Sequence, residues 1–253
     1  MFRPRVIPVL LLKNRGLVKS AKFKNHRYIG DPINAVKIFN DLKADELAFL
    51  DISASKEKRI ISPEFVKNVG EEANMPFSVG GGISTVQHIR DIIACGAEKV
   101  IIGSQAVRTP EFISEAADTF GSSTITVCID VNKTIWGKEK VFIQNGKQST
   151  IYHPVEFALL MEKMGAGELI VQSVLHDGMM EGYHLDLVRQ IASEVNIPVV
   201  ALGGAGSMND FKAAVQLSHA SAIAAGSLFV YHGARKGILI NYPGKESLKQ
   251  LFE

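Results

Sequence analysis

Several features that define other classes of protein are scarce in this sequence. Only two of the 253 residues are cysteine, which excludes a fold held together by disulfides. The 28 basic residues nearly balance the 26 acidic ones, and the net charge of +2 gives no support for a nucleic-acid or membrane-surface partner. The apolar run Val6–Leu12 is too short to cross a membrane and lacks a small-residue cleavage site. We therefore expect a globular, cytoplasmic protein with a buried strand at this position.

The two cysteines, Cys95 and Cys128, lie inside apolar stretches and far apart in the sequence. This placement is typical of buried free thiols in a reducing compartment. No cysteine or histidine spacing typical of a zinc site occurs. The sequence thus predicts no metal and no organic cofactor.

The sequence does contain short apolar segments, rich in β-branched residues, that alternate with longer segments of helical period. The apolar segments show little polar alternation, as expected for parallel strands that helices cover. Helices are predicted to begin at Pro32, Pro63, Pro110 and Pro154, because proline fits the first helical turn. The eight predicted strands cover Val6–Leu11, Leu47–Asp51, Phe77–Val79, Val100–Gly103, Ile125–Asp130, Leu169–Gln172, Val199–Leu202 and Ala222–Ala225. This order predicts a single α/β domain over residues 1–253, a (β/α)8 TIM barrel.

The two halves of the chain resemble each other at a nearly constant spacing. Asp45–Leu50 corresponds to Gly167–Gln172, which lies 122 residues later, and the loops after predicted strands three and seven correspond at a spacing of 123. A duplicated four-strand unit explains this pattern. We therefore expect a two-fold internal repeat of half-barrels, over about 1–122 and 123–253.

One segment departs from the predicted repeat. Residues 132–151 follow the fifth strand and have no evident counterpart in the first half. The Asn145-Gly146 pair within them is typical of a two-residue hairpin turn. We therefore expect an inserted hairpin near 132–151, with Trp136 packed against the barrel.

In an eightfold barrel the reactive groups lie on the loops that follow the strands. Small residues gather in four of these loops, in two sets that the repeat relates. The first set is Gly81, Gly82, Gly103 and Ser104, and the second is Gly203, Gly204, Gly226 and Ser227. Such loops let backbone N–H groups approach an anion. Their duplication favours two phosphate sites over the alternative that the glycines only make tight turns.

Three carboxylates follow predicted strands. Asp51 ends the second strand, Asp130 ends the fifth, and Asp177 lies in the loop after the sixth. A carboxylate at such a position can serve as a general acid or base, although each could equally cap its loop or pair with a neighbouring lysine. The repeat places Leu11 where a counterpart of Asp130 would stand. One of two symmetry-related carboxylates is therefore missing.

Charged residues also stand just before four predicted strands, at the opposite end of the barrel. They are Arg5, Glu46, Lys99 and Glu168. Facing inward they would form a neutralised ring that gates the barrel, although charges at such positions are more often solvated. Among the histidines, His88 is expected on a helix in a surface or capping role, whereas His176 and His232 lie in loops of the reactive face.

These residues resemble those of the cyclase subunit of imidazole glycerol phosphate synthase over essentially the whole chain. The segments that carry the resemblance are Gly30–Pro32, Phe49–Ser55, Pro76–Ile83, Gly165–Glu168 and Gly203–Gly206. The resemblance implies a barrel that docks a glutaminase subunit on its amino-terminal face and receives ammonia through its interior. It implies a phosphorylated small-molecule substrate, a formimino aminoimidazole carboxamide ribonucleotide, which ammonia converts to imidazole glycerol phosphate. It also implies phosphate contacts from the glycine loops and Lys19, and an ammonia gate made by the four charges.

The chain departs from the family at the reaction centre. Asp130 matches one of the two family aspartates, but Leu11 stands at the other, and leucine can neither accept nor donate a proton. A positioned acid or base contributes about 10²–10⁴-fold, so ring closure should be badly impaired unless another carboxylate substitutes. Gln172 and Leu175 also replace residues usual in the family, and Gly103 stands where asparagine is usual.

This combination resembles a second-copy branch of the family that occurs with sugar amidotransferases in surface-polysaccharide gene sets, and Leu10–Lys19 is typical of that branch. The resemblance implies a diverged subunit that supplies ammonia for converting an N-acetyl group on a nucleotide-linked sugar to an acetamidino group. One alternative is a genuine histidine-pathway cyclase that uses Asp130 alone, or with Asp51 or Asp177. Another is a scaffold that only activates its glutaminase.

Overall fold

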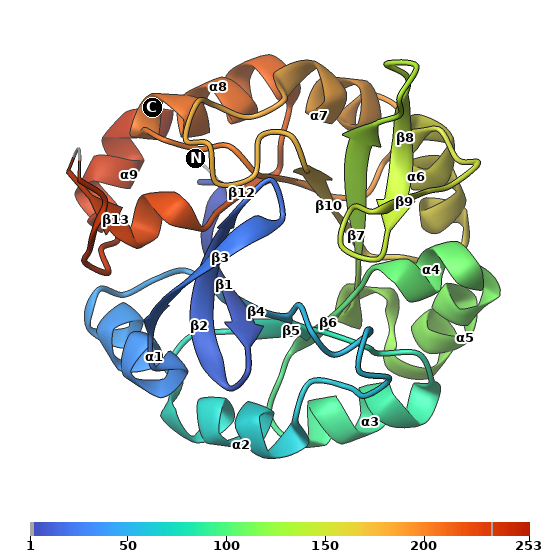
Figure 1. Ribbon diagram of the computed structural model, residues 1–253, viewed down its shortest axis with the longest axis horizontal. Helices are drawn as coiled ribbons and strands as arrows, with labels where there is room; N and C mark the ends of the chain where they lie inside the picture. The colour runs from blue at the N-terminus through green and yellow to red at the C-terminus, as the bar shows by residue number, and fades with distance from the viewer. Residues whose placement is uncertain (1–2, 234) are drawn as a thin grey trace.

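The computed structural model describes residues 3–233 and 235–253. Eight parallel strands form a closed barrel in the order β10, β11, β12, β1, β4, β5, β6 and β7, and pairing of β7 with β10 closes it (Figure 1). The strands are β1 (Arg5–Lys13), β4 (Leu47–Asp51), β5 (Phe77–Gly80), β6 (Lys99–Ile102), β7 (Ile125–Lys133), β10 (Glu168–Ser173), β11 (Val199–Leu202) and β12 (Ala222–Ala225). The prediction of a (β/α)8 barrel is confirmed, and each predicted strand lies within about three residues of an observed one.

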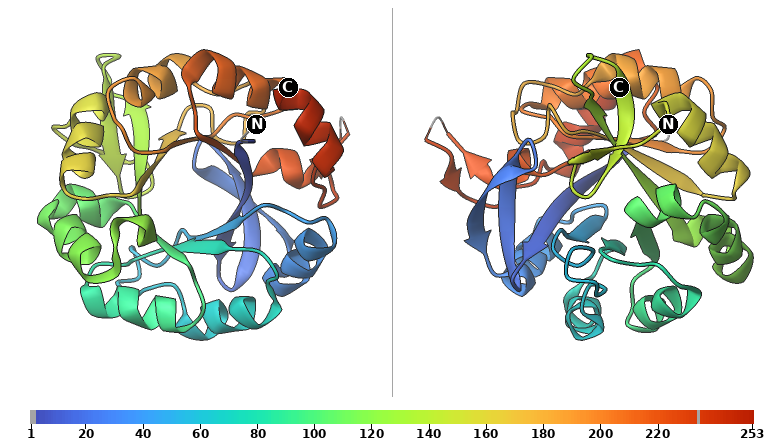
Figure 2. Two further views of the ribbon diagram at one scale, coloured as in Figure 1. Left: turned by 180° about the vertical axis from the view of Figure 1, so that it is seen from behind. Right: turned by 45° about the vertical axis from the view of Figure 1, so that its right-hand side comes forward.

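Helices surround the barrel in a ring, as both face views show (Figures 1 and 2). They are α1 (Pro32–Asp41), α2 (Pro63–Glu72), α3 (Val86–Ala94), α4 (Ser104–Arg108), α5 (Glu111–Phe120), α6 (Pro154–Lys163), α7 (Leu185–Ala192), α8 (Met208–Ser218) and α9 (Lys245–Phe252). Asp31 and Ser62 accept backbone N–H bonds at the starts of α1 and α2, each followed by the predicted proline. Pro110 instead lies one residue before α5.

Both faces of the barrel strands are buried, which explains the missing polar alternation. On β1, Val6 and Leu10 point into a large core beneath the helices, whereas Ile7 and Val9 point into a separate apolar cluster inside the barrel. Side chains of a strand alternate between its faces, so each strand contributes to both cores. Every second residue therefore faces the barrel interior and can line a path along its axis.

Two antiparallel extensions stand on opposite sides of the barrel opening (Figure 1). After β1 the chain forms β2 (Gly16–Ala21) and β3 (Lys24–Gly30), and after β7 it forms β8 (Glu139–Ile143) and β9 (Gln148–Ser149). The second extension lies inside the predicted segment 132–151. The expectation that only the second half carries a hairpin was wrong, because β1 and β7 are both followed by one. The symmetry of the two halves is therefore greater than the sequence suggested.

Two further expectations are corrected by the burial of side chains. Trp136 lies at the tip of the β7–β8 hairpin with 83% of its surface exposed, so it does not pack against the barrel. Cys95 and Cys128 are free thiols as predicted, but both are only half-buried. The described helices include none that is both long and apolar enough to span a membrane. The remaining short strands β13 (Tyr231–His232) and β14 (Gly237–Ile238) pair near the last helix.

Candidate active site

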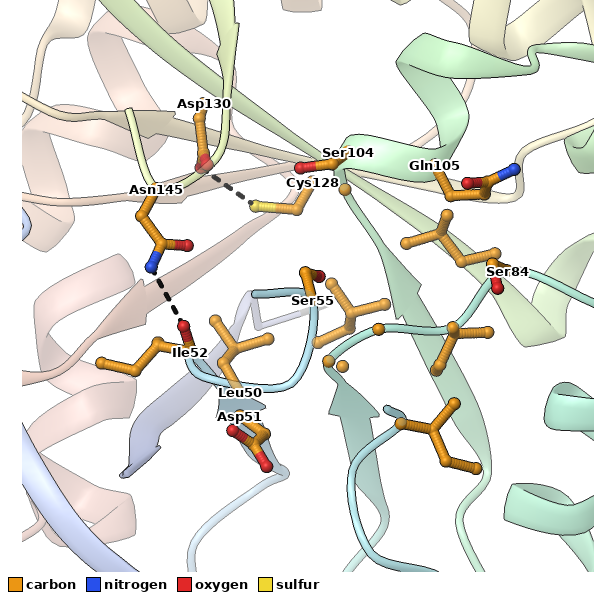
Figure 3. Close-up of a pocket in the computed structure, with 18 of the residues that line it drawn as sticks. Leu50, Asp51, Ile52, Ser55, Ser84, Ser104, Gln105, Cys128, Asp130 and Asn145 are labelled. Atoms are coloured by element: carbon orange, nitrogen blue, oxygen red, sulfur yellow. Dashed lines mark hydrogen bonds between the residues drawn. The ribbon is translucent and has the colours of Figure 1, made fainter. Parts of the chain in front are cut away.

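A cavity of about 430 Å³ opens at the end of the barrel where the strands terminate. This size is sufficient for a small organic ligand. Asp130 of β7 lies at its inner end, where the thiol of Cys128 donates a hydrogen bond of 3.7 Å to the Asp130 carboxylate (Figure 3). Cys128 and Asp130 are two residues apart on one strand, so both point into the barrel. The predicted carboxylate thus faces the cavity.

Asp130 is buried beside Cys128 on its own strand and in register with Gln172 of β10. Burial raises the pKa of its carboxyl to about 7, partly opposed by the hydrogen bond from Cys128, while the charge of Asp177 raises it further. Leu11 lines the same cavity from β1, which lies four strands from β7 in both directions around the barrel. An apolar side chain therefore occupies the position across the barrel from Asp130. Near neutral pH this single carboxyl is present in both protonated and ionised forms.

The two other candidate carboxylates are tied to loops. Arg59 donates a hydrogen bond of 2.5 Å to Asp51, whose carboxylate also accepts the backbone N–H groups of Ser53 and Ala54. Asp177 accepts hydrogen bonds from the Ser20 hydroxyl at 2.8 Å and from the Phe23 backbone at 3.2 Å. Both carboxylates therefore act as loop anchors in this structure. Asp130 remains as the candidate proton donor or acceptor.

Asp177 holds the hairpin formed by β2 and β3 in place. Besides the two bonds to its side chain, its backbone carbonyl accepts the N–H of Lys22 at 2.8 Å. Burial raises the pKa of the Asp177 carboxyl, and the bonds from Ser20 and Phe23 oppose that shift. The loop after β10 thus clamps the hairpin that borders the cavity.

The predicted phosphate loops of the first half line the large cavity. Gly82 has a φ of +70°, and a Cβ there would lie 1.9 Å from the backbone oxygen of Arg59. Close packing of two loops therefore requires glycine at this position, whatever the cavity binds. Gly103 and Ser104 line the cavity from the neighbouring loop. The backbone N–H of Gly82 donates to no other group in the described part of the chain, so it is free to meet an anion.

The loops of the second half enclose only about 30 Å³, which is room for a water molecule or two. Lys19 fills the space: its ammonium group donates a 2.6 Å bond to the carbonyl of Val9, and a Cβ on Gly226 would lie 2.5 Å from it. Burial lowers the pKa of Lys19 to about 8, against the opposing charge of Asp177. The predicted loops Gly203-Gly204 and Gly226-Ser227 do meet here, but they are closed over by Lys19.

The four predicted charges form an ion-pair ring at the amino-terminal end of the barrel. Arg5 bonds to both Glu46 and Glu168, and the ammonium of Lys99 lies 3.6 Å from Glu46 and 3.2 Å from Glu168. The two carboxylates are almost fully buried, and burial raises the pKa of Glu46 while Lys99 and Arg5 lower it. The charges therefore face inward and neutralise one another, as expected if they close the barrel floor.

The barrel interior between the ring and the cavity is apolar. Its cluster includes Ala48, Ile101 and Ala224, whose apolar side chains face the axis. Thr126, directly beside Glu168 in the register of β7 and β10, is 1% exposed, and its hydroxyl has no hydrogen-bond partner among the described residues. An unpaired buried hydroxyl is costly and marks a position where a small polar molecule would be stabilised.

Several residues of the site were not singled out by the sequence. His88, expected in a surface or capping role, lines the cavity together with Lys58 and Arg108 and also accepts the backbone N–H of Ser84 at the start of α3. Asn145, from the hairpin turn, also lines it and donates a 3.0 Å bond to the carbonyl of Ile52 (Figure 3). The only available signal was their position in the segments that follow barrel strands, and many residues share it.

The histidines expected on the reactive face have different surroundings. His176 shares a 2.7 Å hydrogen bond with the hydroxyl of Ser173 and lies beside the ring of His184, which bonds to Glu139 of β8. Burial lowers the pKa of His176. His232 is exposed on the short strand β13 and does not line the cavity. In the described residues no group of three His, Cys, Asp or Glu side chains could hold a metal ion.

A closed parallel barrel with a carboxylate and glycine loops at its carboxyl-terminal face places the protein in the class of (β/α)8 barrels. Within that class, the sequence matches the histidine biosynthesis protein family over residues 5–235, and the chain belongs to this family.

The relatives indicate which member of this family the chain is similar to. The chain is 43% identical, over the full length of both proteins, to a provisional imidazole glycerol phosphate synthase subunit HisF of Leptospira interrogans. It is 45% identical to a provisional subunit hisF2 of Pseudomonas aeruginosa, over 98% of this chain and 99% of the relative. It is also 40% identical to the imidazole glycerol phosphate synthase subunit HisF of Alkaliphilus metalliredigens, over 92% of each. The resemblance to this subunit family is confirmed, and second-copy members are among the relatives.

Proposed function

We propose that this protein is the synthase-type subunit of a glutamine amidotransferase and that it passes ammonia from a glutaminase subunit to an acceptor other than the histidine-pathway ribonucleotide. One observation carries the proposal: the ion-pair ring at one end of the barrel is complete, while the cavity at the other end has Asp130 but only Leu11 across from it. The four charges proposed to admit ammonia are thus all present, whereas one of the two carboxylates proposed for proton transfer is replaced by Leu11.

The proposed path begins at the ring formed by Arg5, Glu46, Lys99 and Glu168. A glutaminase docked on this end would release ammonia against the ring, and displacement of the Lys99 side chain would open it. Lys99 is the side chain of the ring that is most easily displaced, because its ammonium lies 3.2 Å or more from both carboxylates, whereas Arg5 contacts both more closely. Neutral ammonia then crosses the apolar interior, which holds back ions such as ammonium.

At the cavity, Asp130 can take a proton from the nitrogen once ammonia has attacked, or give one to a departing oxygen, since its pKa is about 7. A single carboxyl cannot hold both roles in one step. We propose that the acceptor is the N-acetyl group of a nucleotide-linked sugar destined for a surface polysaccharide. A separate sugar amidotransferase would activate the carbonyl oxygen with a nucleoside triphosphate. Ammonia would then form a bond to the carbonyl carbon and lose a proton, and the activated oxygen would leave as a phosphate or nucleotide to give an acetamidino group.

The relationship to second-copy subunits supports this acceptor over a histidine-pathway cyclase. The changes at Leu11, Gln172 and Leu175 support it as well, because all three lie on or beside the cavity-facing ends of β1 and β10. A non-catalytic scaffold would need neither the shifted pKa of Asp130 nor a cavity of ligand size.

The ring is tested by replacing Lys99 with alanine in the complex with the glutaminase from the same genome. With the sugar amidotransferase and its nucleotide-linked sugar present, acetamidino product is measured with glutamine and, separately, with excess ammonium as the nitrogen source. We expect K99A to reduce glutamine-dependent product about tenfold or more and to spare ammonium-dependent product, because ammonium enters from the open end. Lys67→Ala, on the exposed face of α2, is the matched control. Unchanged coupling in K99A, or no complex with the glutaminase, would contradict the proposal.

A further inference from the structure

We infer that the large cavity binds a diphosphate ester, with one phosphoryl group on the loops of Gly82 and Ser104 and the second on Lys58, His88 and Arg108. The inference deepens the proposed function and rests on its phosphate loops. It assigns a role to three side chains that the proton and ammonia chemistry above does not use.

The three side chains reach the cavity from positions just beyond the phosphate loops. His88 lies in the first turn of α3, six residues after Gly82, and Arg108 ends α4, four residues after Ser104. Lys58 precedes Arg59, whose carbonyl packs against Gly82. All three line the same cavity as the loops themselves. They therefore form an outer zone next to the inner anion site.

The hydrogen bonds of His88 fix which of its nitrogens can donate. Its Nδ1 accepts the backbone N–H of Ser84 at 3.3 Å, so Nδ1 carries no proton. The proton of the neutral ring is then on Nε2, which becomes a hydrogen-bond donor. The Ser84 hydroxyl, 3.5 Å from the same Nδ1, lines the cavity beside it. His88 thus offers a donor to an anion without needing to be protonated.

Lys58 and Arg108 have positive charges that nothing in the described part of the chain neutralises. Neither takes part in an ion pair there, whereas the adjacent Arg59 pairs with both Asp51 and Glu57. The acidic groups that line the cavity are Asp51, which Arg59 compensates, and Asp130 at the inner end. The outer zone is therefore positive and rich in donors, the chemistry that binds phosphoryl oxygens.

The positions of these residues favour a ligand with two linked phosphates over a ligand with one phosphate and a second acidic group far from it. Arg108 lies about one helical turn after Ser104, and Lys58 adjoins Arg59, whose carbonyl packs against Gly82, so the charge that these cations bind lies near the inner phosphate. In a diphosphate the two groups share an oxygen, which meets this condition. The cavity volume of about 430 Å³ leaves room for part of the organic group beyond it.

The test is titration calorimetry of the full-length protein with inorganic phosphate and with pyrophosphate. We expect pyrophosphate to bind about tenfold more tightly than phosphate. In the double variant H88A/R108A this preference should fall to about twofold or less, while phosphate affinity stays unchanged. The matched control is Arg90→Ala, a change of charge on α3 at a residue that does not line the cavity and lies over the ring of Phe120.

Each outcome decides between the possibilities. Equal affinity for the two anions in the wild-type protein, or an equal loss of preference in R90A and in H88A/R108A, overturns the diphosphate site and leaves the proposed ammonia path standing. Binding of neither anion overturns the phosphate loops themselves, and the diphosphate site with them. Thermal unfolding of each variant establishes that it is folded, and the single variant R108A repeats the comparison if the double variant is not.

Discussion

At the scale of single residues, the chemistry of the site depends on what surrounds Asp130. Its carboxyl accepts a hydrogen bond from the Cys128 thiol, and burial raises its pKa to about 7. A second carboxylate at Leu11 would add a nearby like charge and separate the two groups into an acid and a base, as paired carboxylates do in other enzymes. Without it, Asp130 interacts with the charge of Asp177 instead. The pH at which it titrates is therefore a direct readout of its surroundings.

The shifted pKa predicts how stability depends on pH. The folded-state pKa is raised above the ordinary value of 3.8, so the folded protein holds this proton more strongly than the unfolded chain. The contribution of Asp130 to stability is therefore fully present below about pH 4 and is lost as the pH rises toward 7. We expect the free energy of unfolding to fall by on the order of 2 kcal/mol over this range. The fall is smaller than the full pKa shift of Asp130 would give, because the carboxyl faces a cavity open to water.

Denaturant unfolding of wild type and Asp130→Asn, measured from pH 4 to pH 8, checks this expectation. In Asp130→Asn the free energy of unfolding should not show the decline with pH that Asp130 causes. Above pH 7 the variant should therefore be more stable than the wild type. Asp186→Asn, on the exposed start of α7, should follow the wild type. Parallel curves for wild type and D130N would show that Asp130 has an ordinary pKa.

At the scale of elements, the hairpin of β2 and β3 controls the second anion site. Lys19 and Ser20 of β2 fill the space between the loops of Gly203-Gly204 and Gly226-Ser227, and Asp177 holds the hairpin there through Ser20, Lys22 and Phe23. A ligand that carried phosphates at both ends would need this hairpin to lift. A ligand with both phosphates at one end, as inferred above, would not.

Replacing Asp177 with asparagine should loosen the hairpin. The amide keeps the shape but removes the charge that attracts Lys19 and weakens the bonds from Ser20 and Phe23. We expect hydrogen exchange of residues 19–25 to speed up about tenfold, with the exchange of β7 and β10 unchanged. Glu181→Gln, in the same loop, serves as the control. Unchanged exchange in D177N would mean that other contacts hold the hairpin.

The elements also show what the sequence can and cannot predict. The eight barrel strands were predictable because both of their faces are buried and they consist of apolar runs. Strand β3, with the sequence Lys-Asn-His-Arg-Tyr-Ile-Gly, has five exposed residues and no apolar alternation. It is a strand because it pairs with β2. Such pairing uses backbone groups and leaves no apolar run or alternation in the sequence of the strand.

At the scale of the whole molecule, the barrel separates two chemical environments along one axis. The ion-pair ring at the amino-terminal end and the cavity at the carboxyl-terminal end are joined by an apolar interior. Asp130, Leu11 and the four ring charges could be predicted from sequence, since strand order and side-chain alternation determine which end and face they occupy. The gathering of Lys58, His88 and Arg108 could not, because it depends on how three separate loops pack.

The central claim is that this barrel conducts ammonia but no longer closes the imidazole ring efficiently. The most direct test is turnover of the formimino aminoimidazole carboxamide ribonucleotide by the purified protein in excess ammonium, followed by absorbance and by product mass. The account predicts turnover at least about a hundredfold below that of a histidine-pathway subunit carrying both aspartates, with a partial gain in Leu11→Asp and none in Leu11→Asn. Turnover equal to that of the two-aspartate subunit would contradict the account and identify the protein as a working cyclase.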